Sequence, residues 1–128
     1  MPVTSCRRWR VRLVCAVAAA ALLPLPALAH HGWNWAEDGN SELTGVIVRA
    51  RLGNPHGELT LAVGGVNWIV EVGQPWRNQR AGLTDDMLAK GVKLTVLGHR
   101  HVDPAKRVFK AERVFIGERK FDLYPDRD

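Results

Sequence analysis

The chain has very little cysteine, and what it has lies near its start. Cys6 and Cys15 are the two cysteines of the 128 residues, and none follows them. A protein processed behind this region has no disulfide and no thiolate, so a metal site in it must use histidine, carboxylate or backbone ligands. Catalytic signatures are missing too: there is no redox cysteine pair, no phosphate-binding glycine loop and no serine, histidine and aspartate order of a hydrolase. The sequence therefore favours a binding protein over an enzyme.

The chain also lacks an apolar run long enough to stay in a membrane. Residues 13–25 are apolar, but prolines interrupt them and they fall short of the roughly 20 residues that span a bilayer. Arginines at positions 7, 8, 10 and 12 precede this run, and the small-x-small triplet 27–29 follows it. This layout is typical of a secretory signal peptide. We expect residues 1–29 to be cleaved, leaving 30–128 as a single periplasmic or secreted domain that meets the membrane only during export.

A basic excess is missing from the expected mature domain. Four of the eighteen lysine and arginine residues, and none of the thirteen acidic residues, lie in 1–29, so the formal charge falls from +5 to +1 after cleavage. A protein that binds nucleic acid through phosphate contacts keeps a strong positive charge. We therefore expect no nucleic-acid partner.

Alternating apolar and polar residues predict a series of β-strands. The expected strands span residues 43–52, 58–63, 66–72, 92–101 and 108–116, with a short apolar tail at 121–124. Gly64-Gly65 suits a tight hairpin between the second and third strands. Between the third and fourth strands, Thr84 is a plausible N-cap, acidic residues follow it, and Gly91 is a stop signal. One short helix is expected there.

Three strands, one short helix and two further strands are the order of a small five-stranded OB-like barrel. The fold class is therefore all-β with one short helix. The alternative is an open antiparallel sandwich, which uses the same strands and differs in closure.

Several motifs resemble one family of small exported bacterial proteins, catalogued as domain of unknown function 6152. They are His30-His31-Gly32, Asn54-Pro55-His56, residues 67–71 with Gly73 and Pro75, and residues 84–98. The chain departs from the family pattern at Leu83, Val92 and Gly57-Glu58. The resemblance implies an exported single domain with a barrel-like fold, and it implies no established activity.

The histidine pair next to the expected cleavage site predicts a metal site. Cleavage after Ala29 gives His30 a free amine, so that amine and imidazole can chelate one metal ion. His31 at the second position offers a competing planar arrangement. His56, behind Pro55 in the loop after the first strand, is the expected third ligand. Nitrogen donors in a tetragonal arrangement favour Cu(II), although Zn and Ni also accept them.

The other histidines form a weaker candidate, and all of the histidines also have an ordinary structural interpretation. His99 and His101 are two residues apart on an expected strand, so they form a secondary metal candidate or are ordinary surface residues. The pair at His30 and His31 can also be polar residues that keep the cleavage junction accessible, and His56 a turn residue.

Tryptophans offer a second kind of site. Trp33, Trp35 and Trp76 can form a platform for a glycan or peptide, or they can simply cover an end of the barrel. Glu58 and Glu71 lie on different strands, and nothing in the sequence says that they converge. The sequence thus predicts an exported metal-binding protein, with a glycan-binding or peptide-binding barrel as the alternative. It leaves the oligomeric state open.

Overall fold

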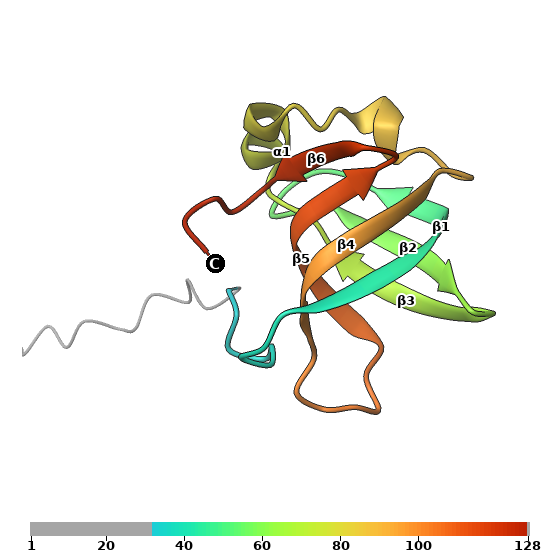
Figure 1. Ribbon diagram of the computed structural model, residues 1–128, viewed down its shortest axis with the longest axis vertical. Helices are drawn as coiled ribbons and strands as arrows, with labels where there is room; N and C mark the ends of the chain where they lie inside the picture. Colours follow the sequence, from blue (N-terminus) through green and yellow to red (C-terminus); the bar gives the residue numbers. More distant parts are fainter. Residues whose placement is uncertain (1–31, 128) are drawn as a thin grey trace, which may run out of the picture.

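Six β-strands and one short α-helix make up the described part of the chain. The computed structural model describes residues 32–127 (Figure 1). The elements are β1 (Ser41–Arg51), β2 (Glu58–Val63), β3 (Val66–Glu71), α1 (Pro75–Ala81), the 3-10 turn η1 (Asp85–Leu88), β4 (Lys93–Arg100), β5 (Val108–Ile116) and β6 (Arg119–Asp122). All strands belong to one sheet in the order β3-β2-β1-β4-β5-β6.

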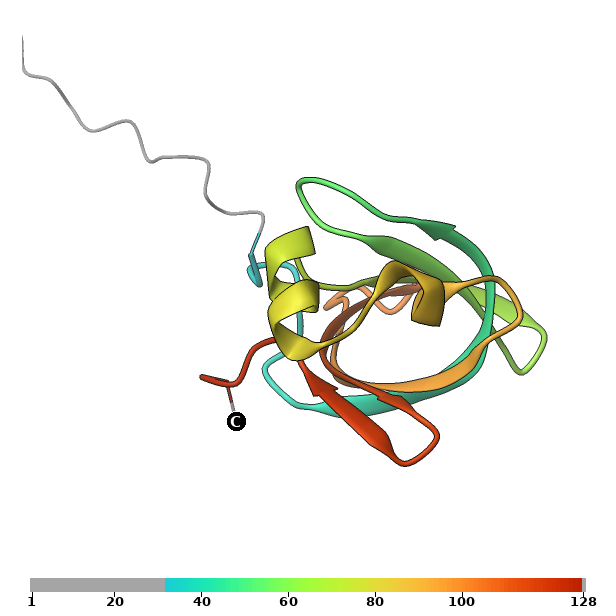
Figure 2. The same ribbon diagram turned by 90° about the horizontal axis from the view of Figure 1, so that it is seen from above.

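A parallel pairing between β3 and β5 closes the first five strands into a barrel. Ile69, Val70 and Glu71 of β3 pair with Val108, Phe109 and Lys110 of β5. The long strand β1 pairs with β4 through its first half and with β2 through its second half. Figure 2 shows the resulting ring, with β6 attached to β5 outside it. The predicted five-stranded OB-like barrel is confirmed, and the open sandwich is wrong because the β3–β5 pairing closes the sheet.

Alternate side chains fill the barrel interior. In β1, Leu43 and Ile47 are buried, whereas Thr44 and Val46 are exposed. The other strands contribute Leu59, Leu61, Val70, Leu94, Val96, Phe109 and Val114. The period of two seen in the sequence therefore sorts side chains between the core and the outer surface.

The helix lies earlier in the chain than the sequence predicts. Pro75 stands at the start of α1, and Gly82, with φ of 79°, ends it. The expected helix after Thr84 is wrong, because residues 85–88 form one 3-10 turn and Thr84 makes no side-chain cap. Leu83 and Leu88 are both buried. Leu83 precedes this turn and Leu88 ends it, so one tight turn is enough to place both in the core.

The predicted signal peptide, residues 1–29, lies outside the described residues, as do His30 and His31. Among residues 32–127, no helix combines the length and the apolar character needed to cross a bilayer.

Candidate functional site

The loop between β1 and β2 carries His56 and is held against the end of β3. Gly57 N donates to Gly73 O at 3.2 Å, and Val72 N donates to Gly57 O at 2.9 Å. A Cβ at position 57 would lie 2.7 Å from Val72 Cγ2, so the close approach of the two segments requires glycine. The His56 side chain is consequently fixed beside β3 and is 20% exposed.

Glu71 links His56 to Lys110. His56 Nε2 lies 3.3 Å from Glu71 Oε1, and Lys110 Nζ donates to Glu71 Oε2 at 3.2 Å. A carboxylate this close to one imidazole nitrogen favours the tautomer with its proton on Nε2, which leaves the lone pair on Nδ1. Within residues 32–127, no group donates a hydrogen bond to that Nδ1. His56 is thus oriented through one nitrogen.

The two carboxylates that the sequence left unplaced face each other across β2 and β3. Glu58 and Glu71 are direct partners in the sheet register, and both line a cleft of about 440 Å³ with His56. They have different partners, however: Arg51 Nη2 donates to Glu58 at 3.3 Å, whereas Glu71 binds Lys110. Each carboxylate therefore neutralises its own cation, which is unlike the paired acids of a glycoside hydrolase.

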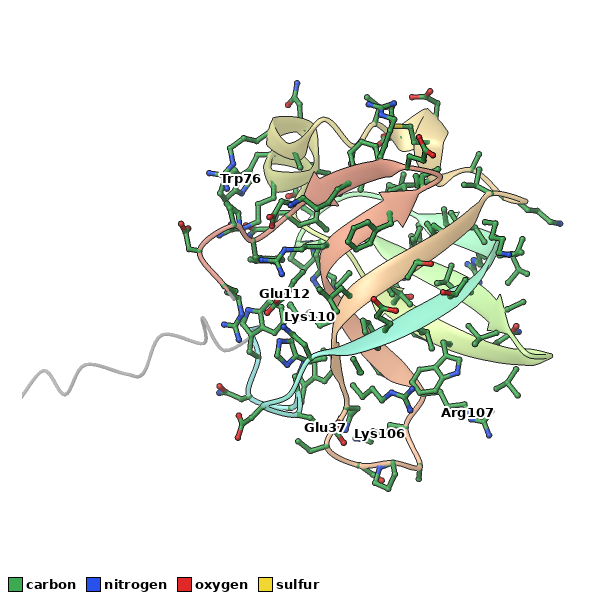
Figure 3. All side chains as sticks on the ribbon, viewed as in Figure 1. Glu37, Trp76, Lys106, Arg107, Lys110 and Glu112 are labelled. Atoms are coloured by element: carbon green, nitrogen blue, oxygen red, sulfur yellow. The ribbon has the colours of Figure 1, made fainter. Side chains whose placement is uncertain are left out.

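His56 also lines a second cleft of about 350 Å³, here called the His56 cleft. Gly32, Trp33, Lys110 and Tyr124 are among its other lining residues. The first described residue of the chain therefore lies at the same cleft as His56. Figure 3 places Lys110 on the side of the barrel that also carries Trp76.

Trp33 covers the outer face of β5 beneath this cleft. Its ring meets those of His99 and Tyr124 edge-on, with centroids 5.2 and 5.1 Å apart. Arg127 Cζ lies 3.9 Å from the ring centroid and Lys110 Nζ lies 5.2 Å from it, which are cation–π distances. Lys110 is only 3% exposed as a result.

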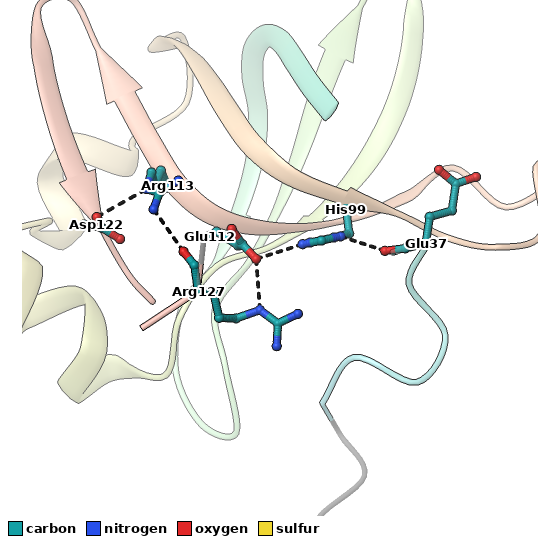
Figure 4. Close-up of polar contacts among 6 residues, drawn as sticks. All are labelled: Glu37, His99, Glu112, Arg113, Asp122 and Arg127. Carbon is teal, nitrogen blue, oxygen red and sulfur yellow. Dashed lines mark hydrogen bonds and ion pairs between the residues drawn. The ribbon is translucent and has the colours of Figure 1, made fainter. Parts of the chain in front are cut away.

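Under Trp33 lies a covered charge layer, which we define as His99, Lys110 and Glu112. His99 Nδ1 lies 2.6 Å from the carbonyl oxygen of Glu37, and Nε2 lies 2.8 Å from Glu112 Oε1 (Figure 4). Arg127 Nε donates to the same Glu112 oxygen at 2.9 Å. A carbonyl only accepts, so His99 Nδ1 donates to Glu37, and this bond orients the ring toward Glu112.

Sequence reasoning missed most of this layer. Lys110 and Glu112 flank Ala111 in β5, where alternation points them out of the barrel and predicts exposure. The sequence signal was present but weak: two charged residues of opposite sign, two positions apart, in a mostly apolar strand.

The secondary candidates His99 and His101 do not share an environment. Both nitrogens of His99 are engaged, so a metal there would have to displace Glu37 or Glu112. His101 stacks on Trp35, with centroids 5.2 Å apart, and its Nδ1 accepts from Asp103 N at 2.9 Å. The two rings thus serve different contacts.

Trp76 is the most exposed tryptophan of the described chain, at 49%. Arg77 Cζ lies 4.4 Å from the Trp76 centroid and 4.5 Å from the Tyr124 centroid, so one guanidinium joins the two rings. Trp33 contacts Tyr124 in turn. Trp33 and Trp76 therefore border one continuous surface, whereas Trp35 packs on His101.

Tyr124 has a perturbed ionisation in the His56 cleft. Burial raises the pKa of Tyr124 above its ordinary value of 10.0, and the negative charge of Glu71 raises it as well. Arg77 and Arg127 act in the opposite direction and lower the pKa. The hydroxyl therefore keeps its proton at neutral pH and is available as a hydrogen-bond donor.

Within residues 32–127, no three histidine, cysteine or acidic side chains come together to hold a metal ion. The predicted ligand set includes His30 and His31, which lie outside these residues. The described chain thus provides one of the predicted ligands, His56, at a cleft bordered by Gly32.

Comparison with known proteins identifies the family. The model of a family of unknown function, DUF6152, matches residues 16–108, so the chain belongs to this family, as the sequence motifs predict. No curated protein matches the chain. A solved structure described as the ZRD-deleted mutant of TiaS in complex with agmatine is similar to 60% of this chain, with 16% identity and a TM-score of 0.46. The chain spans 21% of the length of that protein.

Proposed function

We propose that this member of the family of unknown function DUF6152 is an exported periplasmic or secreted protein that binds Cu(II). The ligands in this proposal are the amine and imidazole of His30 and the imidazole of His56, with His31 as a competing ligand or a neighbour. Amine and imidazole nitrogens suit a tetragonal copper site.

One observation carries the proposal: Gly32 lines the same cleft as His56. His30 lies two positions before Gly32, and two extended residues reach about 7 Å. The cleft, of about 350 Å³, leaves room for an ion and its ligands at that reach. An amino terminus created by cleavage after Ala29 would therefore begin within about 7 Å of Gly32, a residue that lines the cleft together with His56.

The surroundings of His56 support a role as ligand. Metal-binding histidines commonly present their second nitrogen to a carboxylate, which fixes the ring and makes the ligating nitrogen more basic. Glu71 stands in that relation to His56 Nε2, at 3.3 Å. Lys110 shares the Glu71 carboxylate and holds its orientation. We therefore assign Nδ1 of His56 to the metal and Glu71 to positioning.

The test is a Cu(II) titration followed by electron paramagnetic resonance. The protein is purified after export, and mass spectrometry establishes whether it begins at His30. We expect one equivalent of copper with a nitrogen-rich tetragonal signal. An added alanine before His30, or His56→Ala, should weaken binding about tenfold or more because each removes a ligand. Competition with Zn and Ni in the same titration identifies the preferred metal.

His101→Ala is the matched control, because it removes a partly exposed imidazole that contacts Trp35 rather than the cleft. Its signal should equal that of the unchanged protein. Equal, weak binding by all four proteins would refute the copper site. Loss of copper binding in His101→Ala alone would place the copper site at His101, directly after β4, instead of at His56.

A second candidate function rests on the surface between Trp33 and Trp76. Arg77 lies against both Trp76 and Tyr124, so aromatic rings and a cation border the His56 cleft together. Such a surface suits a glycan or a peptide. This function predicts that oligosaccharides or peptides change tryptophan fluorescence without copper, and that Trp76→Ala removes the change. A fluorescence response to copper alone would contradict it.

A further inference from the structure

A separate cleft lies at the end of the barrel where β4 runs into the β4–β5 loop. Its volume is about 250 Å³, and its lining includes Trp68, Arg100, Lys106 and Arg107, with Glu37. Figure 3 shows Glu37, Lys106 and Arg107 together at this end, away from Trp76. None of these residues lines the His56 cleft.

Three cations surround this cleft without an acidic partner. Among residues 32–127, neither Arg100, Lys106 nor Arg107 forms an ion pair, although six other ion pairs occur in the same part of the chain. Glu37 is the one carboxylate in the lining. Like charges gathered around a concave surface create a positive potential that attracts anions.

The backbone holds these cations in place. Ile69 N donates to the carbonyl of Arg107 at 2.9 Å, which ties the loop to β3. Glu37 N donates to the carbonyl of Arg100 at 2.8 Å, which ties the end of β4 to the amino-terminal segment. The charged side chains therefore extend from fixed points rather than from a free loop.

Trp68 adds an apolar surface to the cations. Its ring packs partly against the core, and Arg100 Cζ lies 5.2 Å from the ring centroid. A guanidinium held by a ring is ordered in advance, so it loses less freedom when it forms paired hydrogen bonds to an anionic oxygen group. The cleft thus combines a flat apolar wall with donors for a carboxylate or sulfate.

We propose that this cleft binds an acidic sugar unit of a glycan, with its anionic group between Arg100 and Arg107 and its ring against Trp68. The small volume fits one ring rather than a chain of several. A single-stranded nucleic acid instead stacks successive bases on several aromatic side chains along a basic groove. Here the lining contains one tryptophan, and His101 is already stacked on Trp35.

The experiment is calorimetric titration of the protein, purified after export, with trigalacturonate at low ionic strength. A neutral trisaccharide is the control ligand. We expect trigalacturonate to bind and the neutral sugar not to bind. The double variant Lys106→Gln/Arg107→Gln should weaken binding about tenfold or more, because charged hydrogen bonds to the anion are lost. In nuclear magnetic resonance, the Trp68 indole signal should shift on binding.

Lys90→Gln/Lys93→Gln is the matched variant, since it removes the same charge from exposed residues at the start of β4. Position 93 lies seven residues from Arg100, or about 23 Å along the strand. This variant should bind as the unchanged protein does. Equal weakening in both double variants, or no binding of trigalacturonate, overturns the proposal. Tighter binding of a thymidine trinucleotide through Lys106 and Arg107 would overturn it in favour of nucleic acid.

Discussion

The barrel interior and the covered charge layer outside it are buried to the same degree, but the interior consists of apolar side chains and the layer of charged and polar ones. Strand β5 contributes to both: Phe109 and Ala111 point inward and are fully buried, while Lys110 and Glu112 point outward and are 3% and 1% exposed. The alternation of the strand decides the side chain's direction. It does not decide burial, because Trp33 covers the outer face.

The two regions also differ in what closes them. The interior is closed by neighbouring strands, whose pairing follows from local patterns and short connections. The charge layer is closed by segments outside the strands: Trp33 lies before β1, and Arg127 lies after β6. Polar groups buried in this way need specific hydrogen-bond or ion-pair partners, whereas buried apolar groups need only a space that fits them.

The largest effect should come from the interior. Phe109→Ala removes a fully buried ring and should lower the free energy of unfolding by about 3 to 5 kcal/mol, measured by chemical denaturation. Phe115→Ala, on the same strand but partly exposed, is the control and should cost clearly less. Equal losses would mean that the interior is no better packed than the outer surface.

Breaking the charge layer should cost nearly as much. Glu112→Ala leaves His99 Nε2 and Arg127 Nε without their shared acceptor and should destabilise the protein by about 2 to 3 kcal/mol. Tryptophan fluorescence should change as well, because Trp33 lies against both partners.

Glu118→Ala is the control for this variant, because that glutamate is exposed at the turn between β5 and β6. It should leave the unfolding free energy almost unchanged. A loss below about 0.5 kcal/mol for Glu112→Ala, the size of an ordinary surface change, would show that the layer contributes no stability.

Gly98 couples the two regions, since it lies beside His99 at the β-bulge between β4 and β5, where Glu112 is the extra residue of β5. A Cβ there would overlap the Lys110 carbonyl and lie 3.0 Å from Glu112 N. Gly98→Ala should therefore separate β4 from β5 locally and cost about 1 to 2 kcal/mol in thermal unfolding. Gly39→Ala, with open space around it, should be neutral. Equal melting temperatures for the two variants would contradict the close packing at the bulge.

The fold was largely predictable because its signals are local. The period of two along β1 and the Gly64-Gly65 turn require no knowledge of distant residues. The helix position was not predictable from capping signals, because Thr84 makes no side-chain cap and the acidic residues after it lie in a 3-10 turn rather than an α-helix. The helix instead begins at Pro75 and ends before Gly82, whose positive φ closes it.

The candidate site was predictable only in part. His56 could be proposed from its turn and from the expected new amino terminus. Its contact with Glu71, and through it with Lys110, joins the β1–β2 loop to β3 and β5 across the barrel closure, and no local pattern records that pairing. The burial of His99, a predicted secondary metal candidate or surface residue, has no local signal either, because the ring that covers it is Trp33, 66 positions earlier in the chain.

The smallest expected effect is a shift in the pKa of Tyr124, which tests whether Trp33 shields this residue from water. Tyr124 is the single tyrosine of the chain, so tyrosinate absorbance near 295 nm reports on it alone. Its titration midpoint should lie above pH 10.0, because burial raises its pKa. The folded protein then holds this proton more tightly than the unfolded chain does, so the associated stability is complete below pH 10 and declines as the pH rises further.

The Trp33→Ala variant tests the cause of this shift. It should admit water to Tyr124 and move the titration midpoint back toward 10.0. Trp35→Ala is the control and should leave the midpoint unchanged, because Trp35 is stacked on His101 instead. Circular dichroism at each pH confirms that the barrel is still folded. A midpoint of 10.0 in the unchanged, folded protein would mean that water reaches the Tyr124 hydroxyl as it reaches an exposed tyrosine. The outer surface under Trp33 would then not be buried as the barrel interior is.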